Sequence, residues 1–323
     1  MSGLVDGEWV GTDYETGDDG EFERQETTFR DRIGPDGSFP IEAGRYHLYI
    51  SRACPWAHRT AMTRSLKGLD DAISLSLVQP ERYDEGWEFS ETHPDPLYGA
   101  EYLRDVYVRA DPDYTGRVTV PVLWDREEET IVNNESEEIM RMLDVEAHEL
   151  ATRDVDLYPE GYRDEVDRLI DDIYDPINNG VYRAGFAGSQ AAYDEAVTDL
   201  FDALDRYDDL LADQRYLAGD RLTEADLAMF ATLVRFDHVY HTHFKCNRRA
   251  IHEYDNLWGY TKDLYTTPGI ERTVNVDHIV RHYYVSHGDV NPKRLVPIGP
   301  DVDFTEGHDR DRLPGGPPEA LVE

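Results

Sequence analysis

The sequence predicts a mixed α/β domain followed by an all-α domain. Strand and helix patterns alternate from about residue 45 to about residue 145, and a period near 3.6 without clear strands dominates from about residue 158. The length of 323 residues is enough for two domains of ordinary size. We therefore predict an N-terminal extension over 1–44, the α/β domain over 45–145, the helical domain over 158–290, and an irregular tail rich in Pro and Gly over 291–323.

The extension is rich in Gly and acidic residues, and aromatic residues are scattered along it. These aromatic residues are Trp9, Tyr14, Phe22, Phe29 and Phe39. Because the burial of an aromatic ring is favourable, we expect an extended arm that these side chains pin to the body of the protein.

The α/β domain begins with a strand over 46–50. Pro55 then opens a helix that runs to about Lys67, and Gly68 suits the position just after its end. An alternating strand over 73–78 follows. The remaining elements are a helical segment over 102–108, a strand over 118–124 that a proline interrupts, a short strand over 130–132, and a helix over 135–143. The order β-α-β-(α)-β-β-α is that of a thioredoxin-like domain.

An acidic linker over 144–158 leads into the helical half of the chain. The clearest element there begins at Thr223, which precedes Asp226 by three residues and predicts a capping box. Leu222 and Leu227 occupy the positions of a hydrophobic staple around this box. We therefore expect this half to be all-helical.

The formal net charge is −36, from 68 Asp and Glu against 32 Lys and Arg. Such a surface repels phosphate backbones and lacks the basic patch that nucleic-acid binding needs. Only four of the 32 basic residues are Lys, and the 11% aromatic content argues against a disordered acidic chain. An acidic, Lys-poor and globular protein is best explained by the cytosol of a halophile, where ~1 M salt shortens the Debye length to ~3 Å and screens carboxylate repulsion.

No segment approaches the ~18 consecutive apolar residues that a membrane span needs, and the opening residues lack the pattern of a signal peptide. Two cysteines, Cys54 and Cys246, cannot form a disulfide framework, which favours a reducing compartment. We expect a cytoplasmic protein with neither a membrane partner nor a nucleic-acid partner.

Cys54 stands where the first predicted strand gives way to the helix that Pro55 opens. At a helix N-terminus, free N–H groups and the positive end of the dipole favour a thiolate, which lowers a thiol pKa from ~8.5 to ~3.5–7.5. Arg52 and Arg59 bring positive charge close in sequence. Position 57 is Ala, so no resolving thiol of the C-x-x-C kind is present, and a mixed disulfide on Cys54 needs an outside thiol. The alternative is a buried, inert cysteine.

Val120 and Pro121 supply a second element. In a thioredoxin-like domain, a cis X-Pro bond here leaves the N–H and C=O of Val120 free to pair with a peptide-like ligand, whereas a plain edge-strand proline is the alternative. Beyond it, Glu135 and Ser136 open a predicted helix. Free N–H groups and the Ser136 hydroxyl suit a carboxylate, and Glu135 suits an ammonium. These groups fit the amino-acid head of a γ-glutamyl thiol, although an ordinary helix cap needs the same residues.

These three elements in order, ahead of a helical domain, resemble a glutathione transferase, and specifically the Xi class, the glutathionyl-hydroquinone reductases. The resemblance covers about residues 40–300. The matching stretches are 45–49, 54–60, Gly86-Trp87, 119–125, 131–136, 178–182, 243–247, 277–279 and 282–284. Motifs of this kind are far more specific than a bare transferase fold.

The resemblance implies that Cys54 is the catalytic nucleophile. It would attack the sulfur of a glutathionyl-hydroquinone, expel the hydroquinone and become a mixed disulfide that a second glutathione resolves. The residues implied to bind the thiol are Trp87, Arg117, Val120, Glu135 and Ser136. Tyr182, Tyr240 and Tyr283 are implied to line the hydroquinone pocket, where phenol groups can protonate the leaving group. Structural burial is the alternative for each tyrosine, and Tyr284 can stand in for Tyr283. The family also implies a homodimer.

The expected co-substrate is glutathione, or γ-glutamylcysteine if a halophile cytosol is poor in glutathione, since both carry the γ-glutamyl head and the thiol. The partners are then a small-molecule thiol and a quinone-derived conjugate, with no metal. A competing interpretation reads four residues as a zinc site by their spacing. They are His238, His241, His243 and Cys246.

Three other functions compete with this hypothesis. A non-catalytic scaffold on a transferase-like fold would not need Cys54, Pro121, Glu135 and Ser136. A conjugating transferase prefers a Ser or Tyr hydroxyl, which leaves the bound thiol free. A general glutaredoxin-like thioltransferase shares the cysteine chemistry. His58 follows Cys54 by one turn and is either a base for the thiol or a solvated or hydrogen-bonded helix residue.

Overall fold

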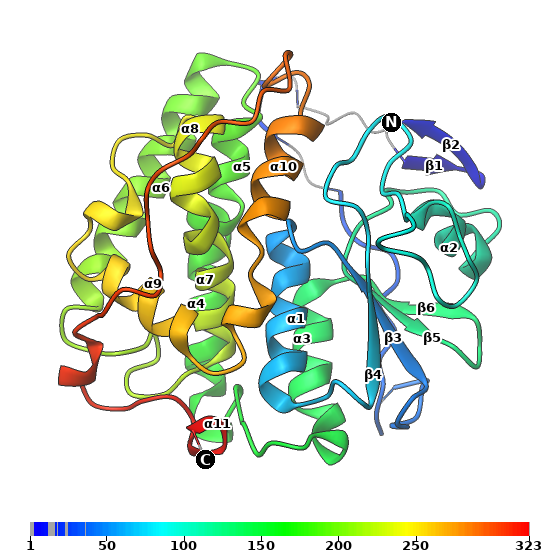
Figure 1. Ribbon diagram of the computed structural model, residues 1–323, viewed down its shortest axis with the longest axis horizontal. Helices are drawn as coiled ribbons and strands as arrows, with labels where there is room; N and C mark the ends of the chain where they lie inside the picture. The colour runs from blue at the N-terminus through cyan, green and yellow to red at the C-terminus, as the bar shows by residue number, and fades with distance from the viewer. Residues whose placement is uncertain (1–2, 12–16, 18, 23–24, 36, 323) are drawn as a thin grey trace. The chain divides into compact units, whose positions relative to one another are not determined.

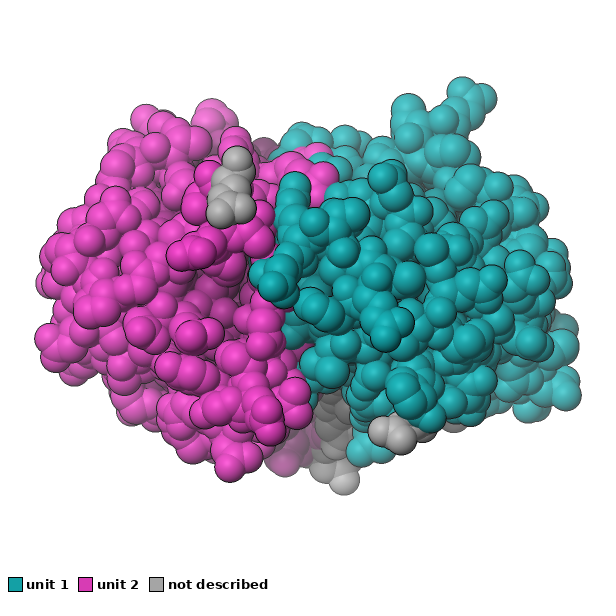
Figure 2. All heavy atoms as spheres, turned by 90° about the horizontal axis from the view of Figure 1, so that it is seen from below, with its two compact units in different colours: residues 1–15, 24–154, 277–286 teal, residues 16–23, 155–276, 287–323 magenta. Residues whose placement is uncertain are grey.

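The computed structural model describes residues 3–11, 17, 19–22, 25–35 and 37–322, so Tyr14 lies outside the described residues. The chain divides into two compact units, coloured separately in Figure 2. Unit 1 comprises Met1–Glu15, Arg24–Asp154 and Asp277–Ser286, and unit 2 comprises Thr16–Glu23, Val155–Val276 and His287–Glu323.

Unit 1 is built on a four-stranded sheet of order β4-β3-β5-β6. Its strands are β3 (Tyr46–Ile50), β4 (Ile73–Leu77), β5 (Val122–Asp125) and β6 (Thr130–Asn133). β3 pairs with β4 in parallel and with β5 antiparallel, and β5 pairs with β6 antiparallel. Every residue of β3 is buried, as expected for a central strand covered on both faces.

Three helices cover this sheet. α1 (Pro55–Lys67) and α3 (Ser136–Asp144) lie side by side on one face, and α2 (Leu103–Ala110) lies on the other (Figure 1). α1 ends at Gly68, whose φ of 65° is the left-handed conformation that favours glycine. The predicted bounds of α1 are confirmed.

The predicted strand over 118–124 is shorter than expected, since β5 begins only at Val122. Pro121 has no N–H for a ladder hydrogen bond. Upstream of it, the backbone of Thr119 pairs with a side chain instead of a strand. The Tyr107 hydroxyl donates to the Thr119 carbonyl at 2.9 Å and accepts from the Thr119 N–H at 3.2 Å.

The expected extended arm begins with a hairpin of β1 (Gly3–Val5) and β2 (Glu8–Gly11). Leu4 and Gly116 exchange two backbone hydrogen bonds of 2.9 Å. Gly3 has φ +122°, and a Cβ there would lie 2.2 Å from the Gly116 oxygen, so only glycine fits this approach. Farther along, Phe22 and Phe39 are buried, so the prediction that aromatic rings pin the arm is confirmed for these two.

The predicted acidic linker over 144–158 contains a short helix and is hydrogen-bonded to the end of α1. The 3₁₀ helix η1 (Glu146–Leu150) occupies part of it. Beyond η1, the Thr152 hydroxyl donates to the Gly68 carbonyl at 2.9 Å, and the Arg153 guanidinium donates to the Ser65 carbonyl at 2.8 Å. These bonds tie the linker to carbonyl groups in the last turn and at the C-cap of α1, where helix carbonyls lack i+4 partners.

Unit 2 is helical, and its described residues contain no sheet. The helices of at least six residues are α4 (Arg163–Ile173), α5 (Gly180–Gly185), α6 (Gln190–Leu210), α7 (Glu224–Arg235) and α9 (Leu257–Thr266). Two π-helical turns, η3 (Tyr174–Asn178) and η4 (Phe236–Tyr240), follow α4 and α7. Every residue of α7 is buried, so it is the central helix of this unit. Among the described helices of both units, none is long and apolar enough to cross a membrane.

The predicted capping box at the start of α7 is confirmed. The Thr223 N–H donates to Asp226 Oδ2 at 2.8 Å, and the Thr223 hydroxyl donates to the same oxygen at 3.0 Å. Leu222 and Leu227, the staple pair, are both buried. α7 is therefore capped by local sequence as well as held by packing.

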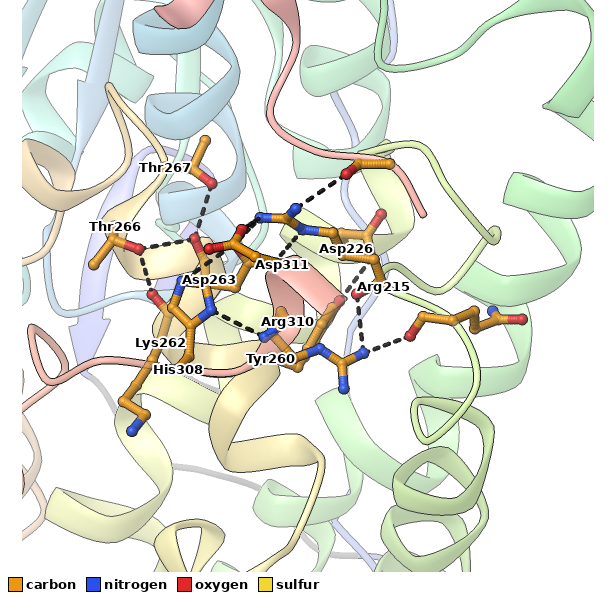
Figure 3. Close-up of polar contacts among 12 residues, drawn as sticks. Arg215, Asp226, Tyr260, Lys262, Asp263, Thr266, Thr267, His308, Arg310 and Asp311 are labelled. Atoms are coloured by element: carbon orange, nitrogen blue, oxygen red, sulfur yellow. Dashed lines mark hydrogen bonds and ion pairs between the residues drawn. The ribbon is translucent and has the colours of Figure 1, made fainter. Parts of the chain in front are cut away.

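The C-terminal tail is irregular except for short turns at Arg310–Arg312 (η7) and Glu319–Val322 (α11). Even so, basic side chains anchor it firmly (Figure 3). Arg310 is fully buried and donates to the carbonyls of Leu211 (2.7 Å) and Gln214, just past the end of α6. Arg215, which forms a two-pronged ion pair with Asp263 at 2.8 Å for each contact, also donates to the Gly315 carbonyl of the tail at 3.0 Å.

Candidate active site

Cys54 is the N-cap of α1 and has an extended backbone, with φ −76° and ψ 123°. Its carbonyl accepts the first helical hydrogen bond, from the His58 N–H at 3.0 Å, and its own N–H donates to the Ser51 carbonyl at 3.2 Å. The side chain is partly exposed and makes no capping hydrogen bond. The thiol therefore lies where the unsatisfied N–H groups of a helix point and is not used to cap them.

The second motif lies against this cysteine. The Val120–Pro121 bond is cis, the first of the two interpretations left open by the sequence, and Cys54 Sγ lies 3.6 Å from the Val120 carbonyl oxygen. No other described residue accepts a hydrogen bond from the Val120 N–H. The structure thus brings the thiol and the backbone of residue 120 together, although 66 positions separate them in the chain.

The basic residues near Cys54 have different surroundings. Arg52 is half-buried, and desolvation lowers the pKa of its guanidinium. Arg59 is buried, and its guanidinium carbon lies 4.6 Å from the centre of the Trp56 ring in a cation–π contact. His58 is also buried, so it is not solvated, and the two other interpretations, a hydrogen-bonded helix residue and a base for the thiol, stay open.

Glu135 is the N-cap of α3, and Ser136 is its first residue. The Glu135 carboxylate accepts from the Glu137 N–H at 3.5 Å, the Ser136 hydroxyl at 3.4 Å and the Thr27 hydroxyl at 3.2 Å. These are long contacts, so they hold the carboxylate only weakly. A ligand ammonium or carboxylate could replace them at small cost, and both the helix-cap and the ligand interpretation are compatible with this geometry.

The two asparagines before Glu135 serve the fold. Asn134 is buried and donates to the Tyr107 hydroxyl at 3.2 Å, while its side-chain oxygen accepts from the Phe29 N–H at 3.2 Å. Asn133 donates to Glu138 at 2.7 Å and accepts from the Glu135 N–H at 2.7 Å. Both amides therefore fix the backbone that presents Glu135.

Trp87 and Arg117 belong to the same unit as Cys54. Trp87 is buried, its ring stacks on His282, and the Arg82 guanidinium lies 5.7 Å from the ring centre. Arg117 is half-buried, and its carbonyl accepts from the Tyr114 hydroxyl at 3.1 Å. The N-terminal hairpin pairs with Gly116, the neighbour of Arg117, and so supports this segment.

Of the three predicted pocket tyrosines, Tyr283 lies in unit 1, on α10 (Val276–Ser286), and is 1% exposed. Its ring meets that of His282 edge-on, with centroids 5.2 Å apart. Its neighbour Tyr284 is buried as well, at 5% exposed. Burial therefore does not separate the two candidates.

Tyr182 and Tyr240 lie in unit 2 and are brought together, with ring centroids 6.1 Å apart. Tyr182 is on α5, directly after η3, and Tyr240 ends η4, so each tyrosine adjoins a π-helical turn. Such turns are frequent at functional sites. Phe244 stacks on Tyr240 at 5.6 Å with an interplanar angle of 13°, and Phe22 of the arm stacks on Tyr182 at 6.5 Å.

The sequence analysis did not assign Phe22, Phe186 and Phe244 to this aromatic cluster. Phe186 packs against Phe22 at 5.4 Å and against Phe244 at 5.0 Å. In the sequence, Phe22 stands out only as an aromatic residue in an acidic arm. Phe186 stands out only because it follows Tyr182 by four residues, which places both on one face of a helix. Neither signal specifies a cluster.

The competing zinc interpretation finds no support in the described part of the chain, where no three His, Cys, Asp or Glu side chains are placed to hold a metal ion. Cys246 is fully buried, and this burial raises the pKa of its thiol. Burial also lowers the pKa of His243 to about 4, and the ring contacts His287 at 3.1 Å. These groups are core side chains.

Comparison with known proteins agrees with this geometry. Residues 53–146 match the glutathione S-transferase N-terminal domain, and residues 190–263 match the C-terminal domain. This defines the class as a thioredoxin-like domain followed by an all-α glutathione-transferase domain, which confirms the predicted fold class.

Individual relatives narrow the class. Glutathionyl-hydroquinone reductase YqjG of Escherichia coli is 48% identical, over 96% of this chain and 99% of its own. Glutathionyl-hydroquinone reductase PcpF of Sphingobium chlorophenolicum is 47% identical, over 93% and 96%. A solved Xi-class transferase from Natrialba magadii is 63% identical with a TM-score of 0.91 over 97% of both chains. The chain belongs to the Xi class of glutathione transferases, the glutathionyl-hydroquinone reductase family.

Proposed function

We propose that this enzyme reduces glutathionyl-hydroquinones to hydroquinones by thiol transfer through Cys54. The Cys54 thiolate attacks the thioether sulfur of the conjugate, and an S–S bond forms as the sulfur–carbon bond breaks. The bonding pair goes to the ring carbon, which takes up a proton, so the carbon is reduced as the sulfur is oxidised. A second thiol then attacks the glutathionyl sulfur, forms oxidised glutathione and releases Cys54 as the thiolate.

The observation that carries the proposal is the contact between Cys54 Sγ and the Val120 carbonyl, 3.6 Å apart at the start of α1. A helix N-terminus favours the thiolate that attacks. The Val120 N–H, which has no acceptor among the described residues, gives the backbone of a bound cysteinyl thiol a partner beside that sulfur. Position 57 is Ala, so the mixed disulfide persists until a second thiol arrives.

In this proposal the thiol-binding domain is residues 45–145, and its ligand contacts are Trp87, Arg117, Val120, Glu135 and Ser136. The γ-glutamyl carboxylate binds the Ser136 hydroxyl and the first N–H groups of α3, where the dipole favours an anion. The ammonium binds Glu135, whose present contacts of 3.2 to 3.5 Å are weak. Trp87 provides an apolar wall.

The hydroquinone site is assigned to Tyr182, Tyr240 and Tyr283, with the helical domain taken as residues 158–290. Phenol hydroxyls can deliver the proton that the leaving ring carbon needs, and their rings can stack on the substrate. Support comes from the aromatic cluster around Tyr182 and Tyr240, which contains Phe22, Phe186 and Phe244.

The thiol is glutathione or γ-glutamylcysteine. A solved structure of YqjG, 46% identical with a TM-score of 0.88, is of a glutathione-bound form and covers 95% of this chain. The proposed contacts bind the γ-glutamyl head and the sulfur, which both thiols carry, so either thiol fits the site. We also propose a cytoplasmic homodimer from a halophile, for which light scattering in 3 M KCl tests the dimer.

The test is turnover of glutathionyl-menadione with glutathione in 3 M KCl, followed by release of the hydroquinone. We expect turnover by the unmodified enzyme and by Cys246→Ser, a matched control because that thiol is fully buried. Cys54→Ser should show none. Absence of turnover in every form would favour a non-catalytic scaffold, and turnover of simple mixed disulfides alone would favour a general thioltransferase.

A further inference from the structure

The segment 80–87, which carries Trp87, is tied to α10 by several contacts across about 200 positions of sequence. The Pro80 carbonyl lies 2.7 Å from His282 Nδ1, and the Arg82 N–H donates to the Ser286 hydroxyl at 2.8 Å. Glu81 forms an ion pair with Arg281, with one contact of 2.7 Å. All these residues belong to unit 1, so α10 is a support for the segment within that unit.

His282 also touches Trp87 directly. The imidazole and indole rings are stacked, with centroids 5.0 Å apart and an interplanar angle of 15°. Both side chains are 6% exposed. A stacked pair of buried rings fixes the position of each plane more strictly than a contact between aliphatic side chains would.

The orientation of the imidazole is set by a hydrogen bond. A carbonyl oxygen can only accept, so Nδ1 of His282 carries the hydrogen and donates it to Pro80. The Ser286 hydroxyl, 3.3 Å from the same nitrogen, lies one turn farther along α10. The ring therefore cannot rotate about its last side-chain bond without losing this hydrogen bond.

We infer that His282 is a positioning residue that holds the Trp87 indole in place as the apolar wall of the thiol site. This inference rests on the proposed role of Trp87 in thiol binding. His282 does not touch the thiol in this scheme and acts only through the indole. The Glu81–Arg281 pair holds the backbone of the segment, whereas His282 stacks on the ring, which the Arg82 guanidinium also approaches at 5.7 Å from the ring centre.

The test separates thiol binding from chemistry by using the full chain with Cys54→Ser. Glutathione affinity is measured by titration calorimetry in 3 M KCl on this reference and on three variants of it. His282→Phe keeps a ring and loses the hydrogen bond. His282→Asn keeps a donor near Pro80 and loses the ring, and His282→Ala loses both. Thermal melting of each variant checks that it is folded.

We expect His282→Asn and His282→Ala to bind glutathione about 3- to 10-fold more weakly, in line with the loss of one aromatic pair. His282→Phe should bind within about 3-fold of the reference, since the stacked ring is restored. His278→Ala is the matched control, because it removes another buried imidazole from α10, one that contacts His93. It should lower the melting temperature and leave the affinity unchanged.

Equal affinity in all three His282 variants would overturn the inference, as would a Phe variant as weak as Ala beside an unaffected Asn variant. These results would leave the thiol site itself intact, because the reference protein still binds. If the Cys54→Ser reference binds no glutathione, the proposed thiol site fails, and the role of His282 fails with it.

Discussion

The Sγ atom of Cys54 lies 3.6 Å from the carbonyl oxygen of Val120, the residue that precedes the cis proline. The sheet produces this contact. Cys54 follows β3 after a short turn, and Val120 lies just before β5, which pairs with β3 so that Tyr49 faces Val122. Antiparallel pairing brings the end of one strand next to the start of the other, and two motifs distant in sequence thus form one site.

The phenol groups of Tyr182 and Tyr240 are predicted to act on release of the hydroquinone and not on binding of the thiol. Removal of the hydroxyl that delivers the proton, in Tyr182→Phe or Tyr240→Phe, should slow release by up to ~100-fold, the lower range for general acid catalysis. Single-turnover kinetics measures release, and calorimetry measures glutathione affinity. Tyr265→Phe, on α9 and stacked on Phe304, is the control. Equal losses in release and affinity would contradict these roles.

The capping box predicts a pH dependence of stability. Asp226 is buried and accepts hydrogen bonds of 2.8 Å from the Leu217 N–H, the Thr223 N–H and the Tyr260 hydroxyl. Burial raises the pKa of its carboxyl to about 6. Since this pKa lies above the usual ~3.8 of the unfolded chain, the folded state holds more protons between these values, and stability falls as pH rises through this window.

Urea denaturation from about pH 4 to about pH 7 in 3 M KCl tests this dependence. The free energy of unfolding of the unmodified protein should decline relative to that of Asp226→Asn up to about pH 6 and then run parallel to it. A constant difference between the two proteins across the whole range would show that Asp226 does not titrate there.

The C-terminal tail is predicted to stabilise unit 2 through Arg310. Its buried guanidinium donates to the carbonyls of Leu211, Gln214 and Arg215, which follow the end of α6. Arg310→Met leaves these carbonyls without their charged donor and should cost roughly 2–4 kcal/mol of unfolding free energy. Arg312→Met, two residues away, is the control. Its half-exposed side chain pairs with Asp309 at the surface and reaches the Ala212 carbonyl only at 3.4 Å, so its loss should cost much less. Equal losses would refute the anchor.

The net charge of −36 predicts that the protein needs salt. Mutual repulsion of surface carboxylates is screened at a Debye length of ~3 Å in ~1 M salt and acts over ~10 Å in ~0.1 M salt. The melting temperature should therefore rise between 0.1 M and 3 M KCl. Calorimetry at several KCl concentrations measures it, and a curve that is flat or falls with salt would reject the halophile interpretation.

Local signals were sufficient for much of the fold. Pro55 and Gly68 mark both ends of α1, and Thr223 with Asp226 marks the start of α7, because capping preferences act over a few residues. The strand predicted over 118–124 is too long at its start, since β5 begins only at Val122. Its backbone bonds to the Tyr107 side chain, a tertiary contact that no strand pattern contains.

The candidate site was predictable where its chemistry lies in short motifs, as for Cys54, Val120 and Glu135. The contacts that depend on distant segments were not predictable. Trp87 stacks on His282, almost 200 positions later, and Phe22 of the arm joins the cluster of Tyr182. Periodicity marks such residues as buried without naming their partners.

The central claim is that Cys54 is the sulfur that accepts the thiol. Mass spectrometry of the intact and digested protein, after exposure to oxidised glutathione in 3 M KCl, tests it most directly. We predict one glutathionyl adduct per chain, located on Cys54 and absent from Cys54→Ala. An adduct on the buried Cys246, or an unmodified Cys54 under conditions that keep the protein folded, would contradict the account.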